Sequence, residues 1–429
     1  MCRGREDYPL LVSTLQFPAA GPPVALYVHL PFCVARCPYC DFVVYAGADA
    51  RGPRARTERL YDAIGRELEL RADALDERFG RPDAGGPRRP LRSVYLGGGT
   101  PSLVPGERLE RLLATVRARF GIAPGAEVTL EANPGPDERG DPAAFARAGV
   151  TRISFGAQSL DRGELRRIGR RHSPEDVAAA VHEARAAGIG SINLDLLYDM
   201  PDQSAEAWVR TLRAALAIGP DHLSLYALTP DDPEAEGITG PEGDHLPTPP
   251  GSRRWRERAR LGQDEDRAAD QYLAAADLLA AGGWHAYEIS NWARPGHESR
   301  HNLVYWTREP YEAVGPGAHA FDGLIRRWNG AAMEPYLAAL LPAGGAAAEP
   351  PGGRETIAAE TASAERVILA LRLDTGVPAA WAEGAPLAGW RGWAESAGLL
   401  ERVEVDEGDR LRLTLRGRLL SNELFRRLL

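Results

Sequence analysis

Short β-rich segments alternate with longer amphipathic segments through the first half of the 429-residue chain, and this alternation limits the possible folds more than any other feature. The short segments are rich in β-branched and aromatic residues and are bounded by Gly, Pro or Asn, which is typical of strands. The predicted strands cover residues 24–30, 93–96, 127–131, 151–155, 191–196 and 222–226. Apolar residues at helical spacing, such as Leu109, Leu113 and Val116, predict helices over residues 57–79, 109–120, 174–187 and 204–218.

Repeated strand–helix alternation predicts parallel strands, because each crossover helix returns the chain to the same end of the sheet. Six parallel strands form either an open doubly wound sheet or a complete or partial barrel, and the pattern leaves these alternatives open. In a barrel, functional residues gather at the carboxyl ends of the strands. The fold class is therefore α/β, and a functional site is expected at these strand ends.

Gly- and Pro-rich segments interrupt the alternation, and the last of them, over residues 342–353, is typical of a flexible linker. Beyond it the pattern predicts a helix (355–371), a hairpin with its turn at 407–409 (399–415) and a final helix (419–429), as in a winged-helix unit. The predicted organisation is a tail (1–23), a barrel (24–240), a barrel extension (241–341), a linker (342–354) and a C-terminal winged-helix-like α+β domain (355–429).

Composition excludes several classes of partner. The chain has 51 basic and 60 acidic residues and a formal net charge of −9, whereas a general nucleic-acid binder is normally basic. It has no run of about 18 apolar residues, so no transmembrane helix is expected. The N-terminal segment lacks the basic-then-apolar layout of a secretory signal, so a cytoplasmic location is expected.

Three of the four cysteines, Cys33, Cys37 and Cys40, lie within eight residues directly after the first predicted strand. Three soft thiolates on one loop suit a soft transition-metal centre. A structural zinc site normally has four protein ligands, and here only Cys2 or His29 could be the fourth. In a cubane of four irons, three cysteines leave one iron free for an exogenous ligand. The spacing therefore favours an iron–sulfur cluster over zinc or three inert thiols.

With Tyr39 immediately before the last cysteine, this CxxxCxxC motif resembles the signature of the radical S-adenosylmethionine (radical SAM) enzymes. The resemblance implies a 4Fe–4S cluster whose free iron chelates the amino and carboxylate groups of S-adenosylmethionine. It also implies a partial (β/α)6 barrel of the TIM type as the core fold. The chemistry would be reductive cleavage of the cofactor to a 5′-deoxyadenosyl radical.

Polar residues recur at the ends of the later predicted strands. The triple glycine at 97–99 removes Cβ atoms, so its backbone amides could approach a ligand. Glu131, Gln158 and Asp195 lie in or just after otherwise apolar strand ends, where a polar group is costly to bury unless it is paired or faces a ligand. Their recurrence at one end of the predicted barrel favours a polar ligand.

The segments YVHLPFC, GGGTPS, EANP, SFGAQS and DLLYDMP together resemble the coproporphyrinogen-oxidase-like branch of the superfamily. The resemblance implies that Tyr27 contacts the cofactor near the cluster and that Gly99, Thr100 and Glu131 bind its methionine end. Gln158, Arg170 and Asp195 would reach the ribose and sulfonium region, and Ala227 would flank the adenine through its backbone. The chain departs from the branch at Asp199, where glycine is usual.

Two functions from different classes fit this branch. One is an oxygen-independent coproporphyrinogen III oxidase, which decarboxylates propionate side chains in porphyrin biosynthesis. The oxidases carry a fourth cysteine two residues after the third, where this chain has Phe42, and a long extension before the first strand, where this chain has about 23 residues. The other is the HemW-type haem chaperone, whose HNxxYW motif resembles the segment from His301 to Trp306.

This resemblance implies that His301 is an axial ligand of haem iron, with neighbouring aromatic rings against the macrocycle. Arg300, Arg326 and Arg327 could pair with the propionates. Ser299 stands where the chaperones commonly have cysteine. Two alternatives stay open, namely that His301 is a hydrogen-bonded core histidine, or that one of two other histidines is the ligand, His297 and His319.

The sequence therefore predicts a haem chaperone with a radical SAM core and leaves open whether the chain is also an enzyme. Its predicted cofactors are a 4Fe–4S cluster, S-adenosylmethionine and haem. Its predicted partners are haem and acceptor haemoproteins, with membrane-associated respiratory enzymes as one class of acceptor, and a homodimer is a further expectation.

Overall fold

The computed structural model describes residues 20–47, 55–83, 85–230, 233, 236–240, 242–383, 387–405 and 408–428. Cys2, most of the predicted N-terminal tail and part of the predicted hairpin turn at 407–409 lie outside these residues.

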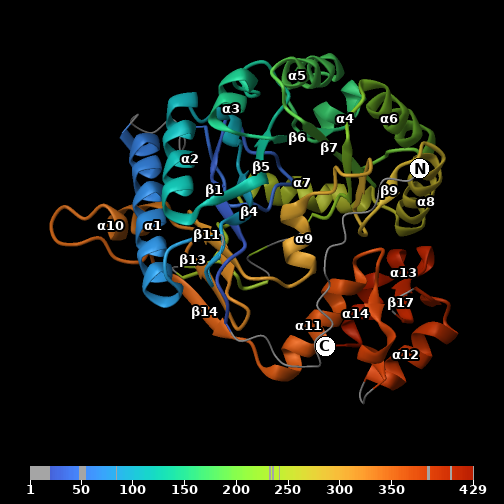
Figure 1. Cartoon of the computed structure of the whole chain (residues 1–429). Helices are drawn as coiled ribbons and strands as arrows, with labels where there is room; N and C mark the ends of the chain where they lie inside the picture. The colour runs from blue at the N-terminus through green and yellow to red at the C-terminus, as the bar shows by residue number, and fades with distance from the viewer. Residues whose placement is uncertain are drawn as a thin grey trace.

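Six parallel strands lie side by side in chain order at the centre of the molecule (Figure 1). They are β1 (Ala25–Leu30), β4 (Leu91–Gly98), β5 (Ile122–Ala132), β6 (Arg152–Gln158), β7 (Ser191–Tyr198) and β8 (His222–Ala227). Each one contains or closely overlaps a predicted strand. Because right-handed crossovers between successive neighbours place their helices on one face, this order differs from that of a doubly wound sheet.

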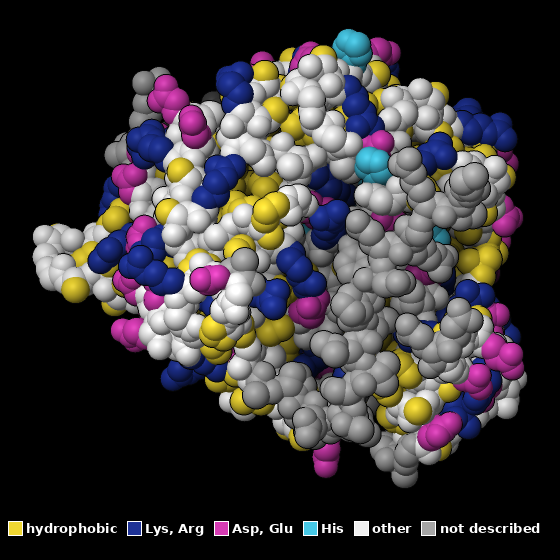
Figure 2. Space-filling model, in the orientation of Figure 1, with side chains coloured by type: hydrophobic (Ala, Val, Ile, Leu, Met, Phe, Trp, Pro, Cys, Tyr) yellow, Lys and Arg dark blue, Asp and Glu magenta, His cyan; other side chains and the backbone are white. Residues whose placement is uncertain are grey.

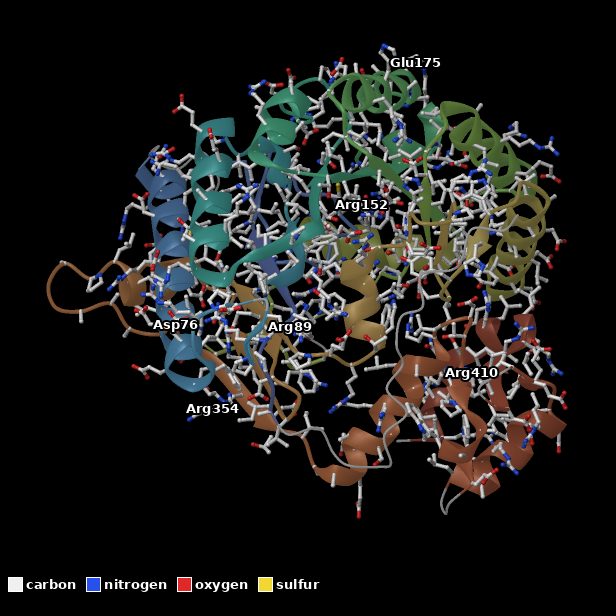
Figure 3. The ribbon with its side chains drawn as sticks, in the orientation of Figure 1. Asp76, Arg89, Arg152, Glu175, Arg354 and Arg410 are labelled. Carbon is white, nitrogen blue, oxygen red and sulfur yellow. The ribbon has the colours of Figure 1, made fainter. Side chains whose placement is uncertain are left out.

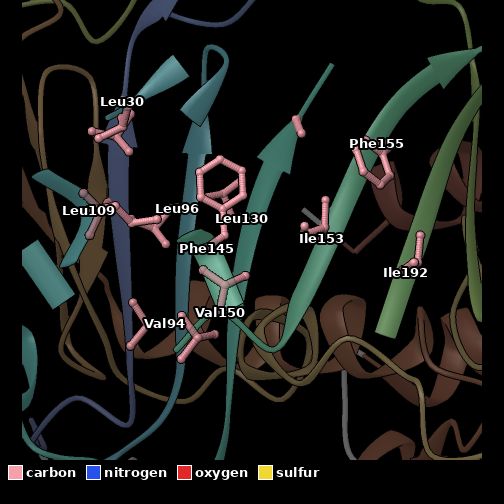
Figure 4. Close-up of a cluster of buried hydrophobic side chains, with 14 of the residues drawn as sticks. Leu30, Val94, Leu96, Leu109, Leu130, Phe145, Val150, Ile153, Phe155 and Ile192 are labelled. Atoms are coloured by element: carbon pink, nitrogen blue, oxygen red, sulfur yellow. The ribbon is translucent and has the colours of Figure 1, made fainter. Parts of the chain in front are cut away.

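An arc of helices covers the outside of these strands in Figure 1. Its members are α1 (Ala55–Phe79), α2 (Gly106–Phe120), α3 (Pro142–Ala148), α4 (Arg162–Arg167), α5 (Pro174–Ala186) and α6 (Ala205–Ile218). Between helices and strands lies one apolar core, and Figure 4 shows part of it. There Leu130 of β5, Leu109 of α2 and Phe145 of α3 are almost wholly buried. Full burial of one such side chain contributes about 1.5–3 kcal/mol, so this layer holds the strand ends in place.

The sheet continues on both sides of the six strands to a total of twelve within the described chain. Beside β1 it adds β11 (Tyr311–Val314), which is parallel to β1, and then β12 (His319–Phe321), β13 (Ile325–Asn329) and β14 (Gly352–Thr356). Beside β8 it adds β10 (Asn291–Ala293) and β9 (His285–Ala286). Since β14 spans residues 352–356, the predicted boundary between linker and C-terminal domain falls inside a strand of the large sheet.

Four further helices connect these added strands: α7 (Pro250–Leu261), α8 (Glu265–Ala281), α9 (Arg300–Trp306) and α10 (Met333–Leu340). Ser299 begins α9, because its hydroxyl accepts a hydrogen bond from the backbone N–H of Asn302. α9 packs against β4, in the middle of the molecule in Figure 1.

The C-terminal unit has its own apolar core around Leu371, Trp390, Leu411 and Leu424. It consists of α11 (Ala359–Leu371), β15 (Val377–Pro378), α12 (Leu387–Ser396), β16 (Leu400–Val403), β17 (Arg410–Leu413), α13 (Leu415–Leu419) and α14 (Ser421–Arg426). Its sheet has three strands in the order β15-β17-β16, one more than the predicted hairpin. The predicted final helix is divided at Leu420 into α13 and α14.

No helix in the described ranges is both long enough and apolar enough to cross a membrane. On the face that Figure 2 shows, basic and acidic side chains are interspersed over the described surface. This mixture agrees with the absence of a basic footprint in the sequence.

Candidate functional site

The cysteine loop leaves the sheet directly after β1 and is held at both ends. β2 (Phe32–Cys33) pairs with β3 (Tyr45–Ala46), so the chain that carries the three cysteines is closed into a loop. Arg256 of α7 is 2% exposed and donates hydrogen bonds to the carbonyl oxygens of Pro38 (3.0 Å) and Cys40 (2.9 Å). Sequence reasoning did not find Arg256, because it lies more than 200 residues from the loop it fixes.

The three cysteines line one cavity of about 460 Å³, which we call the cysteine cavity. The Thr100 hydroxyl donates to Cys33 Sγ (3.4 Å), and the Arg170 guanidinium donates to Cys37 Sγ (3.5 Å). Burial, with a contribution from the neighbouring sulfurs, raises the pKa of Cys33 to about 11 and that of Cys40 to about 12. Thiolates would therefore form here only beside a strongly cationic centre, such as bound metal.

No three His, Cys, Asp or Glu side chains in the described ranges converge closely enough to hold a single metal ion. His29 is not available as a fourth zinc ligand, because Nε2 lies 2.8 Å from the Val43 carbonyl oxygen and Nδ1 lies 3.0 Å from the Tyr27 hydroxyl. In an iron–sulfur cluster each thiolate binds a different iron, so the sulfurs stand apart from one another. Three thiols around one cavity fit that group better than they fit zinc.

The strand ends place the predicted cofactor residues around this same cavity. Besides the three cysteines, the predicted residues that line it are Gly99, Thr100, Glu131, Gln158, Arg170, Asp195 and Ala227. They come from the ends of β4, β5, β6, β7 and β8 and from the segment after α4. Parallel strands in chain order bring their carboxyl ends to one edge, which is why residues as far apart in the sequence as Gly99 and Ala227 meet here.

The triple glycine serves packing. A Cβ atom on Gly98, whose φ is +106°, would lie 2.4 Å from the His29 ring, and one on Gly99 would lie 2.7 Å from the Phe32 carbonyl oxygen. The Gly99 amide donates to the Leu30 carbonyl (3.0 Å), and the Thr100 amide donates to the Phe32 carbonyl (2.8 Å). In this conformation the Gly99 and Thr100 amides attach the cysteine loop to β4, and the approach of the glycine amides to a ligand stays a prediction.

Glu131 lies at the end of β5 and is held by two protein donors. Its carboxylate accepts hydrogen bonds from the Gly98 amide (2.9 Å) and the Tyr95 hydroxyl (2.8 Å). Burial raises the pKa of Glu131 to about 7, with a further contribution from the nearby Asp195. Glu131 therefore exchanges a proton near neutral pH, and a cationic ligand in the cavity would favour its ionised form.

Arg170 ties three parts of the cavity together. Besides Cys37, its guanidinium donates to the side-chain oxygen of Asn133 and to the carbonyl of Gly156. Asn133 in turn donates to the Thr100 hydroxyl (3.2 Å). Sequence reasoning missed Asn133, although it belongs to the EANP segment that pointed to Glu131.

Asp195 and Gln158 line another part of the cysteine cavity. Asp195 accepts hydrogen bonds from Asn193 (2.7 Å) and from the Ser154 hydroxyl (3.2 Å), and burial raises its pKa. Gln158 has a positive φ of 64°, at the point where the pairing of β6 with β7 shifts register. A positive φ in a residue other than glycine is a local strain that often accompanies functional sites.

Arg152 is a cavity-lining residue that sequence reasoning also missed. It is 3% exposed, and Figure 3 shows it inside the array of strands, in contrast to Glu175 on the outer helix α5. Its Nε atom has no hydrogen-bond partner among the described residues. A buried guanidinium with an unsatisfied donor is suited to meet a carboxylate of a bound ligand.

Tyr27 and His301 are the two predicted site residues that do not line the cysteine cavity. His301 is 1% exposed, with Nδ1 3.0 Å from the Ser93 hydroxyl and Nε2 2.9 Å from the Tyr305 hydroxyl. Burial lowers its pKa to about 3. This environment corresponds to the hydrogen-bonded core histidine that the sequence left as an alternative.

Tyr27 lines a second cavity of about 450 Å³, which we call the aromatic cavity. Its aromatic lining is Tyr27, Phe42, Tyr305, Trp306, Tyr311 and Phe321, and its histidines are His29, His245 and His319. Of the three arginines predicted to meet propionates, only Arg326 lines it; His297 does not, and lies 3.1 Å from the Ser191 hydroxyl instead.

The HNxxYW helix α9 contributes to the lining of both cavities. Asn302 lines the cysteine cavity, whereas Tyr305 and Trp306 line the aromatic cavity. Phe42, the residue in place of the oxidases' fourth cysteine, is 65% exposed and lines both cavities.

The class of protein follows from the parallel strands, the cysteine loop and the cavity at the strand ends. A family model described as the radical SAM superfamily matches residues 27–215, the segment from β1 into α6 that builds most of the cysteine cavity. Membership of this superfamily implies a 4Fe–4S cluster and S-adenosylmethionine.

Comparison with individual proteins identifies one family within the radical SAM superfamily. The heme chaperone HemW of Mycobacterium tuberculosis (strain H37Rv) is 40% identical over 415 residues, which cover 96% of each chain. HemW of Escherichia coli (strain K12) is 38% identical, covering 71% of this chain and 73% of the relative. The mouse radical S-adenosyl methionine domain-containing protein 1, mitochondrial, is 36% identical and covers 70% of this chain and 61% of the relative. The chain belongs to the HemW family of radical SAM proteins.

Among solved structures, the coproporphyrinogen III oxidase HemN from Escherichia coli superposes with a TM-score of 0.74. The match covers 96% of this chain and 91% of that one at 20% sequence identity. At this identity the match establishes the shared fold, a mixed α/β radical SAM core followed by a small C-terminal unit.

Proposed function

We propose that this protein is a haem chaperone that binds haem, holds a 4Fe–4S cluster with S-adenosylmethionine, and transfers haem to acceptor haemoproteins. The observation that carries the proposal is the 40% identity to HemW over 96% of both chains. The row of six parallel strands is interpreted as the partial (β/α)6 barrel and the C-terminal unit as a winged-helix-like domain. A cytoplasmic location, a homodimer and membrane-associated respiratory acceptors are further parts of the proposal.

In this proposal Cys33, Cys37 and Cys40 hold the cluster, which when bound supplies an electron to the sulfonium of S-adenosylmethionine. Thr100, with Gly99, lies beside the first of these sulfurs, where the methionine end would bind. The Arg170 guanidinium would provide a positive charge beside Cys37, and the Arg152 guanidinium would bind a carboxylate of the ligand. Gln158, Asp195 and Ala227 complete the nucleoside side of the cavity. Tyr27 does not line the cysteine cavity and would act on the cofactor indirectly. Its ring stacks on Tyr95, which does line the cavity, at a ring-centroid distance of 6.1 Å.

The family resemblance makes His301 one candidate for the haem ligand. In the present conformation it would have to release Tyr305 or Ser93 before either ring nitrogen could bind iron. The aromatic cavity offers the flat apolar walls that a macrocycle needs, beside the same helix.

The test combines two measurements on one anaerobically reconstituted preparation. Titration with haemin should give a shifted Soret band and a saturable midpoint. The same preparation, with S-adenosylmethionine and a reductant, should not decarboxylate coproporphyrinogen. An unchanged Soret band would contradict the chaperone proposal, and formation of protoporphyrinogen would favour the oxidase alternative. The Cys37→Ser variant is the control for the second assay, because any cluster-dependent decarboxylation must be absent from it.

A further inference from the structure

The aromatic cavity contains a pair of histidines, of which the sequence pointed to His319 but not to His245. Asp244 lies between His245 and His319, with Oδ1 3.0 Å from His245 Nδ1 and Oδ2 2.6 Å from His319 Nε2. All three side chains line the cavity. The two histidines come from different segments, since His319 begins β12 and His245 lies in the connection between β8 and α7.

This arrangement leaves different ring nitrogens available on the two histidines. His245 uses Nδ1 for Asp244, and among the described residues its Nε2 atom has no hydrogen bond. His319 uses Nε2, so its remaining nitrogen is Nδ1, which is crowded by its own Cβ atom. The His319 ring also stacks on Trp328, with ring centroids 5.9 Å apart and planes at 22°.

A histidine whose Nδ1 is hydrogen-bonded to a carboxylate is arranged as metal-binding histidines usually are, with Nε2 left to bind the metal. Metal-binding histidines almost always donate the other ring N–H to a carboxylate, a carbonyl or water, which fixes the tautomer and raises the basicity of the ligating nitrogen. His29, the third histidine of the cavity, has both nitrogens occupied.

The rest of the cavity suits a planar apolar ligand with acidic groups. Tyr305 meets Tyr311 edge to face at 4.7 Å, and Tyr311 lies 6.3 Å from Phe321, so these rings form a continuous apolar wall. Arg308 and Arg326 share the carboxylate of Glu365, at 3.1 Å and 2.8 Å. The two guanidinium groups that donate to this carboxylate can also donate hydrogen bonds to a propionate of the ligand. The volume of about 450 Å³ lies within the usual range for cofactor pockets.

We propose that haem binds in the aromatic cavity with His245 Nε2 as an axial ligand of the iron and Asp244 as its positioning residue. The inference rests on the proposed function and replaces His301 as the ligand. It places haem in the cavity next to the cysteine cavity, with Phe42 and residues of α9 in the lining of both.

The experiment is a haemin titration of the full-length protein and of single-residue variants, followed by the Soret band. His245→Ala should raise the apparent Kd at least about tenfold, and added imidazole should restore the wild-type band, because it replaces the lost ligand. Asp244→Asn should raise the Kd by about tenfold, within the range for partners of metal ligands. His182→Ala, on the exposed face of α5, is the matched control and should bind haemin as the wild type does.

A second readout does not depend on how the alanine variant folds. In the reduced haem complex, the iron–histidine stretching band should shift to lower frequency in Asp244→Asn than in the wild type, because the carboxylate makes the imidazole more basic. An unchanged band together with wild-type affinity in His245→Ala would overturn the inference. If His301→Ala alone loses the Soret shift while remaining folded, His301 is the ligand. If the wild type does not bind haemin, the proposed function itself fails.

Discussion

The two cavities beside α9 are nearly equal in volume, about 460 and 450 Å³, but they are built differently. The cysteine cavity is lined mainly by glycines, thiols and polar side chains from the ends of parallel strands. The aromatic cavity is lined by rings and histidines from β1, from the added strands β11 and β12, from α9 and from two connecting segments. The barrel end supplies a polar site for a charged cofactor, and the sheet extension supplies an apolar site for a flat ligand.

The difference shows what the HNxxYW motif does in this structure. Its residues are divided among three environments: Asn302 lines one cavity, Tyr305 and Trp306 line the other, and His301 is buried. A motif that lines two neighbouring sites can be required for both without binding either ligand through its histidine. The four predictions below test this division, in order of decreasing expected effect.

The largest effect is expected for Cys37→Ser, which removes a thiolate from the cysteine cavity. The reconstituted variant should lose nearly all of its iron and acid-labile sulfide, because two cysteines do not hold the cluster. The haemin Kd should change by less than about twofold, since the second cavity is unaffected. Metal and sulfide analysis beside haemin titration measures both. Cys2→Ser is the matched control and should keep its iron; full iron content in Cys37→Ser would contradict the division.

The second prediction concerns the proton on Glu131. Its folded-state pKa of about 7 lies above the ordinary 4.5, so between these values the folded protein binds more protons than the unfolded one. The stability that protonated Glu131 contributes is therefore present below pH 4.5 and is lost as the pH rises through about 7. Urea unfolding of cofactor-free protein at about pH 5 and about pH 8 should show the wild type losing up to about 3 kcal/mol relative to Glu131→Gln.

Glu110→Gln, on the exposed face of α2, is the control for this measurement and should follow the wild type at both pH values. Parallel curves for the wild type and Glu131→Gln would show that the Glu131 carboxyl is better solvated than its contacts indicate.

The third prediction concerns His301. His301→Ala leaves the Ser93 and Tyr305 hydroxyls without their partner and opens a small void, so it should reduce the free energy of unfolding by about 2 kcal/mol. Because burial lowers the pKa of His301 to about 3, wild-type stability from this neutral ring is lost as the pH falls from 6.5 towards 3. Thermal unfolding over this pH range, with His182→Ala as the exposed control, measures the effect. If His301→Ala lowers the free energy of haem binding by far more than it lowers the free energy of unfolding, His301 belongs to the haem site.

The smallest effect is expected for Phe42→Cys, which restores the fourth cysteine of the oxidase pattern. Phe42 is 65% exposed, so the change in unfolding free energy should be less than about 0.5 kcal/mol. Iron content should stay that of the wild type, and no decarboxylation of coproporphyrinogen should appear. Denaturant unfolding and the decarboxylation assay check this, and protoporphyrinogen formation would show that this one position separates the two functions.

Much of the fold could be predicted because local pattern and tertiary structure agree in the first half of the chain. The predicted segment 222–226, for example, became β8 (His222–Ala227), since an apolar β-rich run buried in a parallel sheet has few alternatives. The strand β14 was missed because a segment rich in Gly and Pro has no strand pattern of its own. It is a strand because β13 offers it backbone partners from Ile325 to Asn329.

The candidate site divides in the same way. Ten of the twelve predicted site residues line one cavity, because strand-end position along the chain translates directly into position at one edge of a parallel sheet. Arg152, Arg256 and His245 were missed. Each depends on which element packs beside it, and neighbouring residues in the sequence carry no signal of that contact.

The sequence by itself determined the alternation of strands and helices, the spacing of three thiols on one loop, and the family, since these are properties of adjacent residues or of periods of two to four. Only the tertiary structure decided that His301 is enclosed between Ser93 and Tyr305, while His245 lines an aromatic cavity and its Nε2 has no hydrogen bond among the described residues. The physical reason is that the availability of a ring nitrogen depends on hydrogen-bond partners up to 208 residues away, which close packing selects and local sequence does not specify.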